Sequence, residues 1–202
     1  MKLYYSPGAC SLSPHIVLQE SGLPFEAIAA PTKTHQLADG TDYYTINPLG
    51  YVPFLVLEDG RTLREGPAIV QYLADQVPDK KLAPPAGTFE RYQLQEWLTF
   101  IGTELHKSFS PFFGGNASDD YKAAMKDRLL KRLAFVDAHL AEREYLLGAQ
   151  FSVADAYLFT VTNWAKPVGL DISALAHLAA YRQRISERPA VVAAMQAEGL
   201  IQ

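Results

Sequence analysis

A change of pattern at residues 79–88 constrains the fold of this chain more than any other feature. Before it, short strand-like segments alternate with helical ones in the order strand, helix, strand, long connection, two strands, helix. The segment DKKLAPPAGT concentrates proline and glycine, as inter-domain linkers do. After it, apolar residues recur at the three-to-four spacing of amphipathic helices. We expect an α/β domain over residues 1–80, a linker over 81–88 and an all-helical domain over 89–202.

Local signals mark the ends of several expected elements. Gly22 follows an apolar helical segment, which predicts a glycine C-cap. The Asp59-Gly60 pair is a signal for a two-residue hairpin loop, so the strands on either side of it are expected to be antiparallel neighbours. Ser152 and Asp155 have the spacing of a helix capping box, with aspartate in the place of glutamate.

Composition and charge exclude several classes of protein. The formal net charge is −4, with acids and bases interspersed, so there is no basic stripe of the kind that binds nucleic acid. One cysteine allows no internal disulfide, and the first residues contain no apolar signal segment, so we expect a cytoplasmic location. No apolar run is long enough to span a membrane. The five histidines are scattered without zinc-type spacing, so no metal is expected.

The only cysteine, Cys10, lies in the turn SPGACS between an expected strand and an expected helix. Free cysteine is often a small buried hydrophobic residue, and this is the first interpretation. The second is a reactive thiol, because unpaired N–H groups at a helix N-terminus favour the thiolate. The third is a redox residue, although the second cysteine of a Cys-X-X-Cys pair is missing, which leaves only a mixed disulfide with an external thiol. The three interpretations stay open at this point.

A second segment offers the features of a peptide site. Pro53 at the entrance of a strand cannot donate to the sheet, so the backbone of Val52 is available to a ligand. Glu65 and Gly66 precede a helix, where free N–H groups bind a carboxylate and the Glu65 charge attracts an ammonium. Together with Cys10, these features suit a small zwitterionic peptide that carries a thiol.

Several motifs along the chain resemble one known family. The stretches MKLYYSPGACSLSPHIVL, NPLGYVPFL, EGPAIVQYLAD, ELHKSFSPFF and FSVADAYLF are similar to bacterial beta-class cytosolic glutathione transferases, in particular to members associated with biphenyl degradation. The resemblance covers nearly the whole chain. It implies a thioredoxin-like N-terminal domain of order β-α-β-α-β-β-α, a C-terminal helical bundle domain, and a two-fold homodimer.

The resemblance also implies roles for individual residues. Cys10 and His106 are the expected catalytic residues, with Cys10 beside the glutathione sulfur. Pro53 is expected in the cis form, and Glu104 is expected to reach the glutathione of the partner subunit. The expected glutathione-binding residues are Ser11, His35, Tyr51, Val52, Pro53, Glu65, Gly66, Thr99, Thr103, Glu104 and Lys107.

The implied second-substrate site is apolar and suits small hydrophobic electrophiles. Its expected lining residues are Ala9, Phe109, Phe113 and Trp164. Three positions depart from the family pattern and bear on glutathione affinity. Relatives often carry lysine at Leu49, serine or threonine at Gly66, and asparagine at Thr99.

The function that these residues favour is the transfer of glutathione to hydrophobic electrophiles, extending to the dehalogenation of chlorinated aromatic metabolites. Glutathione is then a co-substrate, and the other partners are a small electrophile and a second copy of the chain. Two alternatives stay open. One is a non-catalytic protein that binds glutathione or apolar compounds, and the other is a glutaredoxin-like monothiol transferase that acts through Cys10.

Overall fold

The computed structural model describes residues 1–202, which form two compact units. The first unit comprises Met1–Ala83 together with Glu187–Gln202, and the second comprises Pro84–Ser186. The expected linker at residues 81–88 stays a prediction. The last residues, Glu187–Gln202, were expected in the helical domain but are grouped with the first unit.

The C-terminal residues belong to the first unit because their helix packs there. Helix α8 (Pro189–Ala197) lies against α1 (Leu12–Ser21). The Arg188 Nε donates to Glu20 Oε1 at 2.6 Å, which anchors the start of α8 to α1. Periodicity identifies such a segment as helical but does not indicate which unit it packs against.

A four-stranded sheet is the centre of the first unit, in the order β2-β1-β3-β4. Its strands are β1 (Lys2–Tyr5), β2 (Glu26–Ala29), β3 (Phe54–Val56) and β4 (Thr62–Arg64). The pair β1–β2 is parallel, because α1 crosses between them, whereas β1–β3 and β3–β4 are antiparallel. This confirms the thioredoxin-like class of fold.

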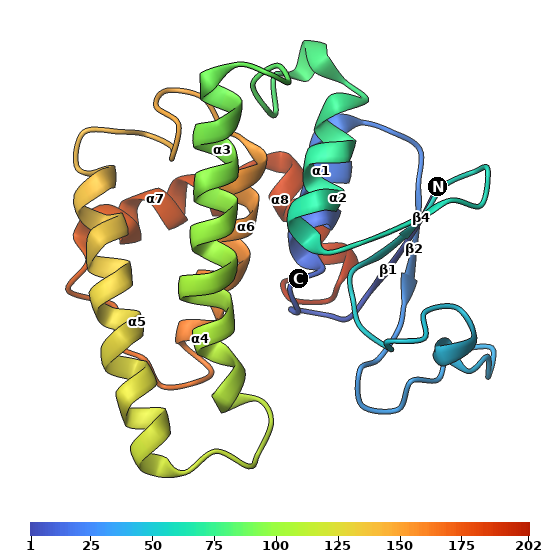
Figure 1. The fold of residues 1–202 in the computed structure, drawn as a ribbon, viewed down its shortest axis with the longest axis horizontal. Helices are drawn as coiled ribbons and strands as arrows, with labels where there is room; N and C mark the ends of the chain where they lie inside the picture. Colours follow the sequence, from blue (N-terminus) through green and yellow to red (C-terminus); the bar gives the residue numbers. More distant parts are fainter. The chain divides into compact units, whose positions relative to one another are not determined.

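The long connection after β2 departs from the expected element order. In place of a second α-helix it contains only a 3-10 turn, η1 (Tyr43–Thr45), capped by the Asp42 side chain. Helix α2 (Gly66–Asp75) follows β4, and a second 3-10 turn, η2 (Pro78–Lys80), leads out of the unit. Figure 1 shows α1 and α2 side by side next to the sheet. Gly22 caps α1 in the left-handed conformation at φ 71°, as predicted.

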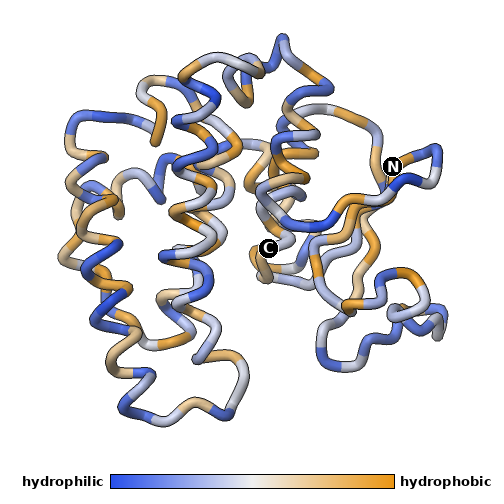
Figure 2. Tube along the Cα trace, in the orientation of Figure 1, coloured by the Kyte–Doolittle hydropathy of each residue, from blue (hydrophilic) through white to orange (hydrophobic).

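The β3–β4 hairpin is confirmed, but its loop has three residues and not two. Leu57 N–H donates to the Arg61 carbonyl at 2.8 Å, so residues 58–60 form the loop between them. Gly60 lies at φ 82°, the left-handed position that ends such a loop. Figure 2 shows the hairpin tip as hydrophilic and β3 as hydrophobic, consistent with a solvent-exposed loop on a buried strand.

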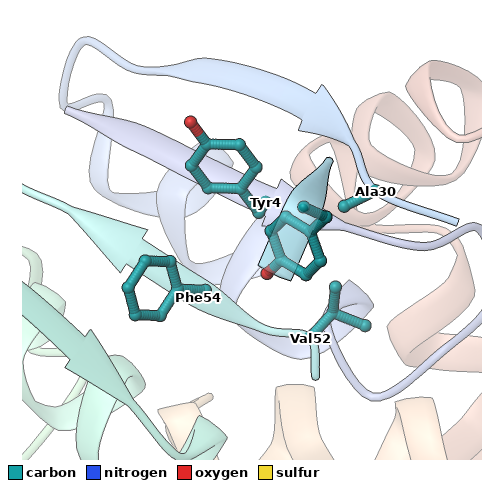
Figure 3. Close-up of a cluster of buried hydrophobic side chains, with 5 residues drawn as sticks. Tyr4, Ala30, Val52 and Phe54 are labelled. Atoms are coloured by element: carbon teal, nitrogen blue, oxygen red, sulfur yellow. The ribbon is translucent and has the colours of Figure 1, made fainter. Parts of the chain in front are cut away.

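Aromatic side chains form one core of the first unit. Tyr4 and Phe54 face each other from β1 and β3, and Val52 lies beside them (Figure 3). Tyr43 is completely buried and packs 5.5 Å from Tyr4, measured between ring centroids. The cluster, which also includes Ala30, fixes the segment in front of Pro53 against the sheet.

The second unit is entirely helical, as predicted. Its helices are α3 (Phe89–Phe100), the π-helix η3 (Ile101–His106), α4 (Lys107–Phe109), η4 (Ser110–Phe112), α5 (Asp119–Leu140), α6 (Val153–Thr162), η5 (Asn163–Ala165) and α7 (Ala176–Ser186). Every residue of α6 is buried, which makes it the central helix of the bundle. Figure 1 shows α3 and α5 lying alongside each other, joined by the Trp97–Phe135 ring contact at 6.1 Å. None of the helices combines the length and the apolar character that a membrane span needs.

Candidate active site

Cys10 lies in the loop between β1 and α1, and hydrogen bonds within the loop fix its shape. The Ser11 hydroxyl donates to the Ser6 carbonyl at 3.2 Å and accepts the Ser6 N–H at 3.1 Å. The Cys10 carbonyl accepts the Ser13 N–H at 3.2 Å, so the cysteine stands directly before the first turn of α1. Ser11 is completely buried and its hydroxyl closes this loop. The predicted contact between Ser11 and glutathione stays a prediction.

The Cys10 thiol is partly exposed, and its Sγ donates to the Val52 carbonyl at 3.2 Å. A thiolate cannot donate, so this contact belongs to the protonated side chain. The helix start favours the thiolate, and the carbonyl contact opposes it.

The Val52–Pro53 peptide bond is cis, which confirms the expectation. The Tyr51 carbonyl in front of it accepts from the Tyr43 hydroxyl and from the Asn47 amide, both at 2.8 Å. These bonds fix the segment in place, whereas the Val52 N–H has no protein partner. A donor left unpaired in a rigid segment is available to a ligand with a backbone of its own.

Glu65 precedes α2 in an unusual backbone conformation, at φ 65°. Left-handed backbone at a non-glycine residue is costly and clusters at functional sites. The Glu65 carbonyl accepts from Ala68 and Ile69, each at 3.0 Å, and its exposed carboxylate has no partner. The free N–H groups at the start of α2 therefore attract a negative charge, and the carboxylate of Glu65, one residue earlier, attracts a positive charge.

Gly66 is the first residue of α2, and a side chain would fit there. A Cβ added to it would meet only Pro53 Cγ, at 3.9 Å. Steric demand therefore does not explain glycine at this position. Leu49 and Tyr51, in the segment before Pro53, are exposed, at 53% and 67%, so both can contact a ligand.

His35 lies in the long connection, at φ 52°, with its ring 4.4 Å from that of Tyr44. Its Nδ1 is buried without a hydrogen-bond partner. Packing against Tyr44 and Gly50 therefore sets the position of the ring. Its role in binding glutathione stays a prediction. Ala9 is half-buried in the Cys10 loop, and its place in the electrophile site also stays a prediction.

Sequence reasoning missed Glu198, which supports the Cys10 loop from the far end of the chain. Its Oε2 accepts the Gly8 N–H at 2.9 Å, and its Oε1 pairs with His15 Nδ1 at 2.9 Å. The side chains of Glu198 and His15 are both buried. No sequence signal indicates this pairing, because 190 residues separate Gly8 from Glu198.

In the second unit, His106 ends a π-helical turn that follows α3 directly. The Lys107 N–H bonds to the Gly102 carbonyl, and such widened turns are frequent at functional sites. The His106 Nδ1 lies 2.6 Å from the Tyr157 hydroxyl, and the Trp164 ring lies edge-on at 4.8 Å. The turn therefore places His106 between two aromatic residues of α6 and η5.

Burial, together with the Lys107 charge, lowers the pKa of His106 from its ordinary value near 6.5 to about 4. The imidazole is therefore neutral at physiological pH. A neutral imidazole offers one N–H donor and one acceptor. It acts through hydrogen bonding and not through a positive charge.

This pKa predicts an acid-sensitive component of stability. Because the unfolded chain protonates His106 near pH 6.5 and the folded chain only near pH 4, stability falls as pH falls through that window. We expect the loss to be about 2–3 kcal/mol, allowing for the exposed part of the ring. Urea unfolding at pH 7 and pH 4.5 measures it, and His106→Gln should lack this component. Equal pH dependence in both proteins would contradict the assignment.

Three of the four predicted polar residues near the π-helical turn already form hydrogen bonds within the unit. Thr99 and Thr103 donate their hydroxyls to the carbonyls four residues earlier, at 2.7 and 2.9 Å. Glu104 Oε2 accepts from Arg132 at 2.7 Å and from Arg128 at 3.0 Å, and these bonds lower the pKa of Glu104. Lys107 is exposed. The predicted contacts of these four residues with glutathione stay predictions.

The predicted lining aromatics occupy three different environments. Phe109 is completely buried, with its ring 5.7 Å from that of Trp164, so it supports Trp164 from the core. Phe113 is 58% exposed and contacts Trp164 at 5.6 Å. Trp164 thus lies among His106, Phe109 and Phe113, and it is 8% exposed. Of the three predicted aromatics, Phe113 offers the most exposed surface to a ligand.

Comparison with known protein families gives matches in both units. The N-terminal domain of glutathione S-transferases matches residues 8–76, and the C-terminal domain matches residues 98–189. Among curated proteins, the chain is 48% identical over 200 residues to glutathione S-transferase GstA of Escherichia coli O157:H7, covering 99% of this chain and 100% of the relative. It is 40% identical to glutathione S-transferase GST-4.5 of Xanthomonas campestris pv. campestris, covering 99% and 100%.

Solved structures agree with this result. The ternary complex of BphK, a bacterial GST, is 56% identical with a TM-score of 0.96, covering 98% of this chain and 100% of that one. The beta-class glutathione S-transferase of Sphingomonas chungbukensis is 48% identical with a TM-score of 0.96, covering both chains fully at 100%. A sphingomonad glutathione S-transferase complexed with glutathione is 47% identical with a TM-score of 0.95, also covering 100% of both chains.

Proposed function

Because the chain belongs to the glutathione S-transferase family, we propose that its first unit binds glutathione through Val52, Glu65 and the start of α2. The observation that carries this proposal is the strained Glu65, whose unpaired carboxylate adjoins free N–H groups. Glutathione has an ammonium and a carboxylate on its γ-glutamyl end, which match those two charges. Its own backbone matches the unpaired N–H of Val52.

The protein is a glutathione transferase, and we propose that its electrophiles are chlorinated aromatic metabolites. The exposed Phe113 and the edge of Trp164 support an apolar second substrate. In the first step the glutathione thiol loses its proton to solvent. The thiolate attacks the carbon that bears chlorine, a C–S bond forms, and chloride leaves with the electron pair of the C–Cl bond. The product is a thioether.

Dehalogenation adds a second step, for which Cys10 is the proposed nucleophile. The Cys10 thiolate attacks the thioether sulfur, forming a mixed disulfide, and the C–S electron pair leaves on a carbon next to a carbonyl group, which then takes up a proton. A second glutathione attacks the mixed disulfide, releases glutathione disulfide and restores the Cys10 thiol. Two glutathione molecules are oxidised and one C–Cl bond becomes C–H.

The stoichiometry of the reaction tests the proposal. With an aromatic ketone that carries chlorine on the carbon next to its carbonyl group as the probe, dehalogenation consumes two glutathione molecules and forms one glutathione disulfide per chloride released. Conjugation alone consumes one and forms none. Saturable glutathione binding without chloride release would contradict the proposal and favour a binding protein. Rapid reduction of a mixed disulfide without chloride release would favour the monothiol transferase.

We also propose that the protein is a homodimer, as the resemblance implies. Exposed aromatic side chains on α3 and α5 support a protein interface. They are Phe89, Tyr92 and Phe135. The proposed contact of Glu104 with the glutathione of a partner subunit uses its Oε1, because Oε2 is held by the two arginines. A cytoplasmic location stays a prediction.

A further inference from the structure

Tyr157 is a residue of the helical unit to which the proposed reaction gives no role. It lies on α6 and is only 4% exposed. Its hydroxyl lies 2.6 Å from the His106 Nδ1, and the two rings meet edge-on, with centroids 5.9 Å apart. The hydrogen bond therefore joins a buried tyrosine to the one histidine at the end of the π-helical turn.

The direction of this hydrogen bond follows from the chemistry of the two groups. A phenol O–H is a stronger acid than a neutral imidazole N–H, and a neutral imidazole nitrogen is a good acceptor. The favoured arrangement has Tyr157 donating and His106 Nδ1 accepting. The proton of the neutral ring is then on Nε2, because the partner of one ring nitrogen decides the state of the other.

The surroundings of the pair restrain the imidazole ring. Gly102, in the turn that carries His106, lies close to the hydroxyl, since a Cβ added there would be in ordinary contact with the Tyr157 oxygen at 3.7 Å. The Trp164 ring, 4.8 Å from His106, limits rotation of the imidazole on the other side. The ring is thus restrained both in orientation and in the location of its proton.

We propose that Tyr157 is a positioning residue, which holds His106 as the Nε2–H tautomer and thereby presents a neutral hydrogen-bond donor to the reaction. This rests on the proposed function and on the catalytic role of His106 that the resemblance implies. No proton transfer to Tyr157 is involved. The hydroxyl acts only by fixing the tautomer and the orientation of the imidazole ring.

The test combines a spectroscopic measurement with kinetics. Nitrogen NMR of imidazole-labelled, ligand-free protein separates protonated from unprotonated ring nitrogens. For His106 we expect an unprotonated Nδ1 in the wild type and a mixture of tautomers in Tyr157→Phe. With glutathione and 1-chloro-2,4-dinitrobenzene, Tyr157→Phe should lower kcat about tenfold, the effect of one lost hydrogen bond, with little change in the KM for glutathione.

Two further variants separate positioning from general packing. Tyr181→Phe removes another buried tyrosine hydroxyl in the same unit, and it should leave the His106 tautomer and kcat unchanged. In a His106→Gln background, Tyr157→Phe should cost no further activity, because its effect passes through His106.

Three results would overturn the proposal: an Nδ1–H tautomer in the wild type, an unchanged kcat in Tyr157→Phe, or additive losses in the double variant. The tautomer is measured without turnover. A wild type that shows the Nε2–H tautomer but no transferase activity would therefore refute the proposed function and the catalytic role of His106, while the positioning of the His106 ring by Tyr157 would stand.

Discussion

Replacing Cys10 with alanine lowers the rate of reductive dechlorination at least about 100-fold, whereas the first conjugation step continues. The reason is that the first step needs only the glutathione thiolate. In the second step a protein sulfur must bond to the thioether sulfur while the bond between that sulfur and carbon breaks. The thioether product should therefore accumulate in the variant. Chloride release, glutathione disulfide formation and mass spectrometry of the products measure the two steps separately.

Cys10→Ser is the matched control for the structural role of the thiol. Serine keeps a donor for the Val52 carbonyl, which the wild-type Sγ contacts at 3.2 Å, but it forms no disulfide. Both variants should lose the second step to the same extent. Recovery of dechlorination in Cys10→Ser would show that Cys10 acts by holding the Val52 segment and not by covalent chemistry.

Replacing Asp155 with alanine removes about 3–5 kcal/mol from the free energy of unfolding of the helical unit. Its carboxylate accepts the Ser152 N–H and hydroxyl, both at 2.8 Å, the Leu146 N–H at 2.9 Å and the Tyr181 hydroxyl at 3.0 Å. Burial raises the pKa of Asp155, and these donors oppose that shift. Alanine leaves all four donors without the carboxylate in a buried site. Urea unfolding followed by far-ultraviolet circular dichroism measures the loss.

Asp171→Ala is the control for this prediction. Asp171 also accepts a backbone N–H, that of Ser173 at 2.9 Å, but it lies on the surface of the same unit. Its replacement should cost much less stability than that of Asp155, because water replaces the lost contact. A loss in Asp155→Ala no larger than that in Asp171→Ala would contradict the account.

Features that depend on local chemistry were predictable from the sequence. The Gly22 cap depends only on a residue that readily adopts the left-handed backbone conformation, as glycine does. The capping box of Ser152 and Asp155 depends only on their spacing of three residues. The succession of strands and helices along the first unit followed from apolar segments and turn residues. The hairpin loop differed by one residue, because Leu57 pairs with Arg61 and leaves Asp59-Gly60 within a three-residue loop.

Features that depend on distant parts of the chain were not predictable. The Tyr157 partner of His106 is 51 residues away, and a π-helical turn, which has no clear sequence signal, aims the histidine at it. The Glu198 contact with Gly8 depends on α8 returning to the first unit. The Glu65 conformation is likewise set by its tertiary position between β4 and α2, since glutamate has no preference for positive φ.

Calorimetric titration of the wild type and of Glu65→Gln with glutathione tests the central claim most directly. The account predicts one glutathione per chain, with the dissociation constant raised roughly tenfold in Glu65→Gln, since the ammonium loses its charged partner. Glu58→Gln, which changes an exposed carboxylate of the same unit, should bind as the wild type does. Equal binding by Glu65→Gln and the wild type, or no binding at all, would contradict the assignment of this site.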